Sequence, residues 1–271
     1  MIVQHNISAL NANRQVGINQ TGTSKAMEKL SSGFRINRAG DDAAGLSISE
    51  KMRGQIKGLN QATRNAQDGI SMIQTAEGAL SETHNILQRM RQLAVQSSND
   101  TNAADDRTAL QSEVTALVAE LDRIAGNTEF NTKPLLDGNL NVSLQVGANA
   151  NQIINFTISS MNAADLGVDA GLSDVDDHTN AQTAITNVND AIKTVSTQRS
   201  NLGAVQNRLE HTIANLGTSA ENLTAAESRV RDTDMATEML EYTKNNILAQ
   251  ASQSMLAQAN QRPQSVLQLL G

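Results

Sequence analysis

The chain has 271 residues, a formal net charge of -7, 39% hydrophobic residues and only 1% aromatic residues. So few rings leave little to line a cofactor pocket or stack on nucleic-acid bases, and an acidic chain is poorly suited to phosphate backbones. The absence of Cys excludes disulfides, iron–sulfur clusters and zinc–cysteine sites. We therefore expect no cofactor, no metal and no nucleic-acid partner.

Hydropathy excludes a membrane protein of the helical class. No window of 18 apolar residues occurs, so we expect no spanning helix and no membrane partner. The first residues lack a basic stretch followed by an apolar one, so we expect no cleaved secretory signal. Abundant Ala and only 2 Pro favour a mainly helical fold.

Charge is unevenly distributed along the chain. Residues 1–65 carry 9 basic and 4 acidic side chains, whereas residues 99–180 carry 3 basic and 13 acidic ones. This pattern suits contact between neighbouring copies in a polymer, and it equally suits ordinary solvated surfaces.

The N-terminal half predicts a thin helix followed by a helical hairpin. Residues 3–30 carry a sparse apolar stripe that includes Ile7 and Leu10, and a turn-rich segment at 97–102 separates a long helix from a shorter one that ends near residue 125. In the long helix every seventh residue is apolar: Met52, Leu59, Ala66, Ile73, Leu80, Leu87 and Ala94. Such a repeat is typical of a coiled-coil-like helix.

In the middle of the chain the spacing of apolar residues changes from a helical to a strand-like period. Apolar residues alternate with polar ones over 142–146 and again over 154–158, which predicts a β-hairpin. Residues 162–180 are rich in Gly and Asp and predict a loop, so the whole non-helical region covers about 136–180.

A second heptad stripe follows. Its positions are again all apolar: Val188, Val195, Leu202, Leu209, Leu216, Leu223 and Val230. The two stripes have equal length, so we expect the N- and C-terminal segments to pair in a long antiparallel helical rod.

The C-terminal segment resembles the N-terminal one in having unburied apolar residues. They are Met235, Met239, Ile247, Met255 and Leu256, with Leu267 and Leu270 in the tail. Pro263 is predicted to end this helix. Apolar ends of this kind imply a partner, disorder in the free chain, or both.

Polar residues offer little chemistry. Asp41 and Asp42 could form a catalytic pair, but the preceding Gly40 makes a helix N-cap the simpler interpretation. His84 lies at the edge of the first stripe, where a core-edge histidine is favoured over a ligand. No nucleophile elbow, phosphate loop or metal motif occurs, so we do not expect an enzyme.

Two long stretches resemble a known family. Residues 31–80, SSGFRINRAGDDAAGLSISEKMRGQIKGLNQATRNAQDGISMIQTAEGAL, are similar to the N-terminal conserved region of bacterial flagellins. Residues 200–271, with SNLGAVQNRLEHTIANL and NLTAAESRVRDTDMATEM, are similar to their C-terminal conserved region. The resemblance covers about 1–135 and 181–271 and is greatest to flagellins of Bacillus-like Gram-positive bacteria.

This resemblance implies a structural subunit of the extracellular filament, exported unfolded by the flagellar type III route. Terminal helices that are disordered in the monomer would fold on polymerisation into an inner coiled-coil domain, formed by 1–40 and 235–271. Residues 41–234 would form the outer helical domain, without the large variable domains of longer relatives. Implied partners are other copies in a helical homopolymer, an export chaperone, the filament cap and the hook-associated junction proteins.

The resemblance also implies two sets of contact residues. Gln88, Arg89, Leu93 and Glu113 match the types expected where an animal flagellin-sensing Toll-like receptor binds. Alternatively, Arg89 and Leu93 form the rod's outer surface and its subunit contacts. The segment from about 232 to 271 would bind the export chaperone through its apolar residues.

Other interpretations remain open at this point. A hook–filament junction protein shares coiled-coil ends, but its sequence differs from the segment SGFRINRAGDDAAGL. A helical signalling or adaptor rod is also Ala-rich and heptad-built, but its long hairpin would not be interrupted by strands.

Overall fold

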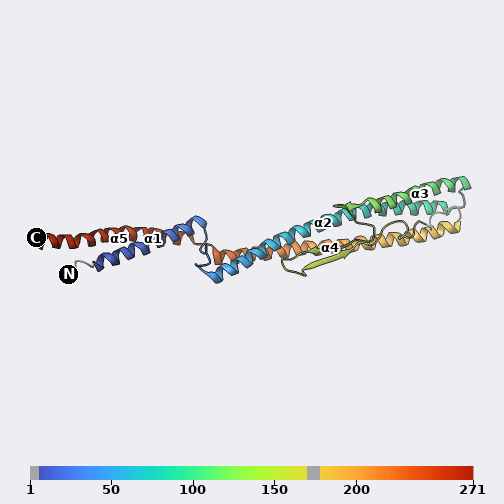
Figure 1. The fold of residues 1–271 in the computed structure, drawn as a ribbon. Coiled ribbons are helices and arrows are strands. Elements are labelled where there is room, and N and C mark those ends of the chain that lie inside the picture. Colours follow the sequence, from blue (N-terminus) through green and yellow to red (C-terminus); the bar gives the residue numbers. More distant parts are fainter. Residues whose placement is uncertain (1–5, 170–177, 271) are drawn as a thin grey trace. The chain divides into compact units, whose positions relative to one another are not determined.

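The computed structural model describes residues 6–169 and 178–270, and the side chains among them except those of 178 and 262–270. Five helices and four short strands follow one another along this part of the chain (Figure 1). The elements are α1 (Ile7–Ser32), α2 (Ala43–Ser97), α3 (Ala104–Asn127), β1 (Glu129–Phe130), β2 (Lys133–Pro134), β3 (Asn141–Gln145), β4 (Ile153–Thr157), α4 (His178–Arg231) and α5 (Met235–Leu270). The fold is mainly helical, with long helices that pack antiparallel, as predicted.

Side chains and a glycine define the helix ends. The carboxylate of Asp42 accepts a hydrogen bond from the Gly45 amide (2.8 Å), which confirms the predicted N-cap of α2. Asp234 caps α5 by accepting from the amides of Ala236 (2.9 Å) and Thr237 (3.3 Å). α1 ends at Ser32 and is capped by Gly33, whose φ of 73° is the left-handed conformation that glycine adopts without strain.

The chain divides into two compact units. Unit 1 comprises residues 1–54 and 221–271, and unit 2 comprises residues 55–220. The helices α2 and α4 therefore contribute residues to both units.

Unit 2 holds most of the hydrophobic core. Within it α2, α3 and α4 run side by side (Figure 1), and the β3–β4 hairpin contacts α2 and α4. The heptad positions Ile73, Leu80 and Leu87 of α2, and Val195, Leu202, Leu209 and Leu216 of α4, are buried. Leu59 is half-buried, and so are the heptad positions that fall in unit 1, Met52, Leu223 and Val230.

Two glycines of α2 make room for the hairpin. An added Cβ at Gly58 would lie 2.9 Å from the Cβ of Ala148, and one at Gly69 would collide with the side chain of Leu144. Polar contacts fix the same hairpin, since Asn65 donates to the Gln145 carbonyl (3.0 Å) and Gln198 to the Thr157 carbonyl (3.1 Å). The hairpin therefore approaches α2 more closely than side chains at Gly58 and Gly69 would allow.

The observed hairpin agrees with the predicted alternation. Asn141–Gln145 pairs antiparallel with Ile153–Thr157, and Val142, Ile154 and Phe156 face the core. A second, shorter hairpin of β1 and β2 was not predicted, because strands of two residues carry no readable period. Of the predicted loop 162–180, residues 162–169 form turns, residues 170–177 lie outside the described residues, and residues 178–180 already belong to α4, so the loop ends earlier than predicted.

The prediction that Pro263 ends the last helix is wrong. α5 continues to Leu270, seven residues beyond that proline. Proline disfavours a helix interior because it lacks the amide donor and its ring crowds the carbonyl four residues earlier, but here helical backbone continues on both sides of Pro263.

Candidate assembly and recognition surfaces

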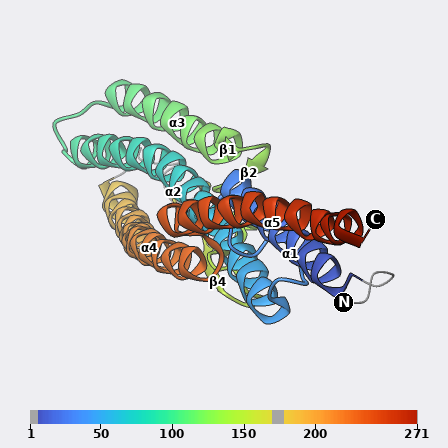
Figure 2. The same ribbon diagram turned by 90° about the vertical axis from the view of Figure 1, so that its left-hand side faces the viewer.

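In unit 1, α1 and α5 pack side by side through polar and small residues (Figure 2). Asn19, which is only 6% exposed, donates to the hydroxyl of Ser252 (2.9 Å), and Asn6 donates to the carbonyl of Ala259 (2.8 Å). Lys29 and Glu238 form an ion pair at 3.5 Å. The contact face of this helix pair is therefore much less apolar than that of a typical helix pair.

Large apolar side chains of the same pair face outward instead. Among the described residues, all exposed large hydrophobics except Val95 and Ile153 belong to unit 1. They include the predicted assembly residues Ile7, Leu10, Met235, Met239, Ile247 and Met255, which are 49–72% exposed. Leu256 is half-buried, and the side chains of Leu267 and Leu270 lie outside the described residues. We call this set of exposed side chains the apolar surface of unit 1.

The two connections at the end of α1 and at the start of α5 are joined by a clamp, residues 33–35 and 230–233. The Arg35 amide donates to the Arg231 carbonyl (2.7 Å), and the Thr233 amide donates to the Gly33 carbonyl (3.1 Å). The Arg231 guanidinium lies 4.7 Å from the centre of the Phe34 ring, within range of a cation–π interaction. No pattern in the sequence relates residues almost 200 positions apart, so this site was not predicted.

The predicted recognition residues lie on α2 and α3 of unit 2. Arg89 and Glu113 form an ion pair at 2.7 Å across the two helices, and each is about half-exposed. Gln88 is exposed and approaches the Nε2 atom of His84 at 2.8 Å.

The expectation that Leu93 belongs to the outer surface is wrong. Leu93 is 1% exposed and is part of the core of unit 2. Heptad counting considers one contact face, whereas this part of α2 packs against both α3 and α4, so a second face is buried. Arg89, Gln88 and Glu113 remain accessible, but Leu93 does not join them.

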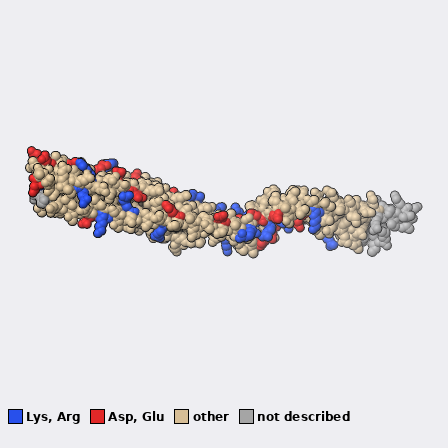
Figure 3. All heavy atoms as spheres, turned by 180° about the vertical axis from the view of Figure 1, so that it is seen from behind, with Lys and Arg blue, Asp and Glu red and all other residues tan. Residues whose placement is uncertain are grey.

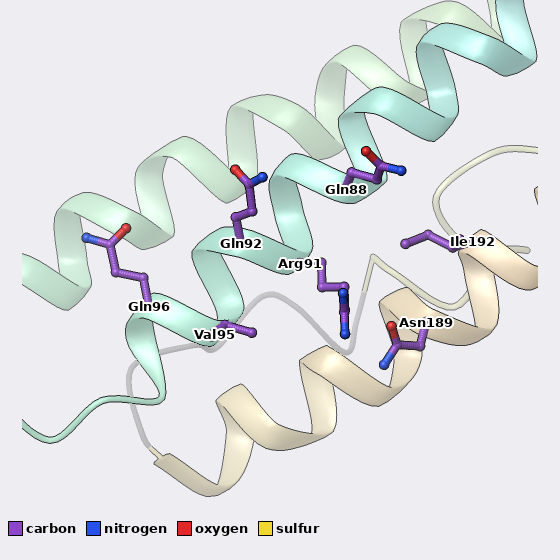
Figure 4. A pocket seen from close by; sticks show the side chains of 7 residues that line it. All are labelled: Gln88, Arg91, Gln92, Val95, Gln96, Asn189 and Ile192. Carbon is purple, nitrogen blue, oxygen red and sulfur yellow. The ribbon is translucent and has the colours of Figure 1, made fainter.

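A groove opens between α2 and α4 on another side of the same segment (Figure 4). Its volume is about 620 Å³, and its lining residues are Gln88, Arg91, Gln92, Val95 and Gln96 of α2 with Asn189 and Ile192 of α4. The Arg91 side chain extends from α2 into the space between the two helices (Figure 4). The groove offers one cation, several carboxamides and an apolar patch.

Among the described carboxylates, Asp41 and Asp234 have lowered pKa values and lie beside helix starts. The amides of Arg38 and Asn37 donate to Asp41 and lower the pKa of its carboxyl, with a smaller effect from Lys25 and Lys29. The amides of Thr237 and Ala236 likewise lower the pKa of Asp234. These carboxylates hold backbone turns. Over the described ranges, no three His, Asp or Glu side chains gather as metal ligands would.

Acidic side chains gather at the end of unit 2 where α2 turns into α3 (Figure 3). Asp100 of this turn is 87% exposed and lies 3.5 Å from Arg107. The acidic segment noted in the sequence is thus largely solvated in a single copy. Whether it contacts a neighbouring copy stays a prediction.

Comparison with known proteins decides the family. The model of the bacterial flagellin N-terminal helical region matches residues 3–141, and the model of the C-terminal helical region matches residues 185–270. The chain belongs to the bacterial flagellin family. Flagellins are structural proteins, and the two matched regions contain the exposed terminal helices and most of unit 2.

Individual flagellins match along the full chain. The chain is 61% identical to a flagellin of Halalkalibacterium halodurans over 271 residues and 55% identical to that of Bacillus subtilis over 303, with all of each chain covered. The crystal structure of Bacillus cereus flagellin matches with a TM-score of 0.51 and 34% identity, over 60% of this chain and 94% of that one. None of the described helices has the length and apolar character that crossing a membrane requires.

Proposed function

We propose that this chain is the repeating structural subunit of an extracellular bacterial flagellar filament, and that its terminal helices become fully buried only when it polymerises. The observation that carries this proposal is the apolar surface of unit 1. Met235, Ile247 and Met255 are 49–62% exposed on a helix pair whose contact face is polar. Neighbouring copies would cover these side chains.

The energetics favour cooperative assembly. Ordering the backbone of a disordered segment costs about 1–2 kcal/mol per residue, and burial of apolar surface returns about 25 cal/mol per Å². A single copy leaves much of the apolar surface of unit 1 in water. The free energy of burying it is therefore gained only when copies contact one another. Those contacts are heterologous and continue as an open helix.

In this proposal residues 1–40 and 235–271 form the inner layer of the filament and residues 41–234 the outer one. The compact units of one copy divide elsewhere, at 54/55 and 220/221. The compact units are defined by contacts within one copy, whereas the proposed layers are defined by contacts between copies in the filament, so their boundaries need not coincide.

Further partners belong to the same proposal. The segment from about 232 to 271 would bind an export chaperone as an apolar helix in a groove, supported by the exposed Met239 and Ile247. Cap and hook-associated junction proteins would contact the filament ends. An animal flagellin-sensing receptor would contact Gln88, Arg89 and Glu113 in the free monomer, where all three are accessible.

Seeded polymerisation tests the proposed function. Purified chain in ammonium sulfate, seeded with sheared filaments, is expected to grow long uniform filaments in negative-stain electron microscopy, because sulfate strengthens apolar burial. Dispersed particles at high concentration in seeded samples would contradict self-assembly. That result would favour a junction protein or a helical adaptor.

A further inference from the structure

The contact between α1 and α5 follows a heptad pattern that few bulky side chains fill. In α1 the less exposed positions include a run in steps of four and three: Ala12, Val16, Asn19, Thr23, Ala26 and Leu30. In α5 a run with the same steps extends from Glu238 to Ala259. We call these two runs the seam. Sliding one helix by seven residues keeps the same face buried, and the seam is mostly small or polar, so apolar packing alone determines the register weakly.

Polar and close contacts instead hold the two helices at one register. Partner numbers on α5 fall as those on α1 rise, so the helices are antiparallel: Asn6–Ala259, Asn19–Ser252, Gly22–Asn245 and Lys29–Glu238. The Asn19 side chain is central, since this residue is 6% exposed and its amide donates to the Ser252 hydroxyl at 2.9 Å. A buried Asn in a coiled-coil seam fixes register because a slip leaves its amide without a partner.

A slip of one heptad in either direction breaks these contacts. In one direction Asn19 would face Ala259, whose methyl group offers no hydrogen bond, so the Asn19 amide would be buried and unpaired. In the other direction Lys29 would face Arg231 instead of Glu238, which places two like charges together. The observed register avoids both costs.

We propose that Asn19 and Ser252 are the register-determining pair of the terminal helices, and that their buried hydrogen bond selects one heptad register of α1 against α5. Both are positioning residues, since apolar side chains at these places would hold the helices together without specifying the register. This inference goes beyond the proposed function, because it concerns contacts within one chain. One register in every copy gives identical subunits, which a filament with a single helical lattice requires.

Disulfide trapping in filaments tests the register, because the chain has no Cys of its own. An added Cβ at Gly22 lies 3.3 Å from the Cγ atom of Asn245, so Gly22→Cys with Asn245→Cys should bridge in the observed register. Lys29→Cys with Asn245→Cys reports a slip of one heptad, since position 29 lies about 10 Å further along α1 than position 22. Both pairs are mildly oxidised after assembly, and the internally bridged chain is quantified on a non-reducing gel.

Asn19→Leu is the variant that carries the prediction. The ratio of observed-register to slipped bridges should fall about tenfold, which is the effect of one lost buried hydrogen bond on an equilibrium. The melting temperature of the filaments should stay equal or rise, because an apolar residue stabilises a helical seam more than Asn does. A residue that only added stability would lower both readouts together.

The exchange variant Asn19→Ser with Ser252→Asn is the matched control. It restores the hydrogen bond with the partners reversed, so it should recover the wild-type bridge ratio. Asn19→Ala removes the amide without adding bulk, and it covers the case in which Asn19→Leu does not assemble. An unchanged ratio in the Leu or Ala variant, or no recovery in the exchange variant, would overturn the inference.

Failure of the proposed function would be visible separately. If the wild-type chain forms no filaments, the proposed function fails, and the same bridge ratios measured on the monomer decide the register. If filaments form normally but the slipped pair bridges as well as the observed pair in wild type, the register inference fails and the filament function stands.

Discussion

At the residue scale, the helical glycines of unit 2 serve different purposes. A Cβ at Gly69 would collide with Leu144 of the hairpin, whereas a Cβ at Gly78, nine residues further along α2, would have nothing within 4 Å. The first glycine allows close packing, and the second has no packing reason. Only the structure distinguishes them, because the sequence shows two similar glycines in one helix.

Alanine substitutions at these two glycines should therefore have opposite effects. Gly69→Ala is expected to lower the free energy of unfolding by about 1–3 kcal/mol, because it overpacks the hairpin contact. Gly78→Ala is expected to raise it by about 0.5–1 kcal/mol, because alanine loses less backbone entropy in a helix. Urea unfolding of the two monomers measures both values, and changes of the same sign would contradict the packing described.

The cap of α5 predicts a pH effect. The amides of Thr237 and Ala236 lower the pKa of Asp234 below 3.8, so this carboxylate stabilises the folded state above pH 3.8. Its contribution is lost as the pH falls through the lower folded pKa. The melting temperature of Asp234→Ala filaments should be lower than that of wild type at pH 7, and the gap should close in strong acid.

Glu241→Ala provides the control for that experiment. Glu241 is exposed within α5 and lies well past its first turn, so its loss removes a carboxylate without removing a cap. A gap of the same size at pH 7 and in strong acid for Asp234→Ala would contradict the role assigned to this residue.

At the element scale, most of the architecture follows from periodicity. The heptads of Leu80 and Leu202 predict the long helices, and the alternation around Val142 predicts the hairpin. The buried side of Leu93 could not be predicted, because it depends on where α3 returns. The clamp and the α2–α4 groove were also missed, since each joins residues that no local pattern relates.

The clamp makes α1 and α5 depend on each other. Phe34→Leu removes the ring beneath Arg231, whose Nε and Nη1 atoms are buried, and a partly desolvated cation–π contact is worth about 1–2 kcal/mol. In filaments we expect faster hydrogen exchange in both 7–32 and 235–261, measured by mass spectrometry. Unit 2 should keep its protection.

Phe130→Leu is the matched control for the clamp. Phe130 packs against the core of unit 2, so its loss should loosen peptides of that unit and leave the terminal helices protected. If Phe34→Leu loosened only α1, or neither terminal helix, the coupling through the clamp would be refuted.

At the scale of the whole molecule, the two units have different roles. Unit 2 buries an extensive core in one copy, whereas unit 1 leaves its large apolar side chains in water. Unit 2 should therefore fold alone, and unit 1 should complete its burial only between copies.

Truncation separates the two roles. Deletion of residues 256–271 removes the last part of α5, including Leu256, Leu267 and Leu270, without touching unit 2. We expect no filaments in seeded ammonium sulfate, with a thermal transition of the remaining helices like that of wild type by circular dichroism. Filaments at normal yield would show that this segment is not needed for assembly.

The burial of unit 1 between copies is tested most directly by methionine oxidation. Met235, Met239 and Met255 are 49–62% exposed in one copy, whereas Met90 and Met161 are buried in unit 2 and serve as internal references. Dilute peroxide should oxidise the three α5 methionines rapidly in the monomer and slowly in filaments, while the references stay slow in both. Equal oxidation rates of the α5 methionines in monomer and filament would contradict the account.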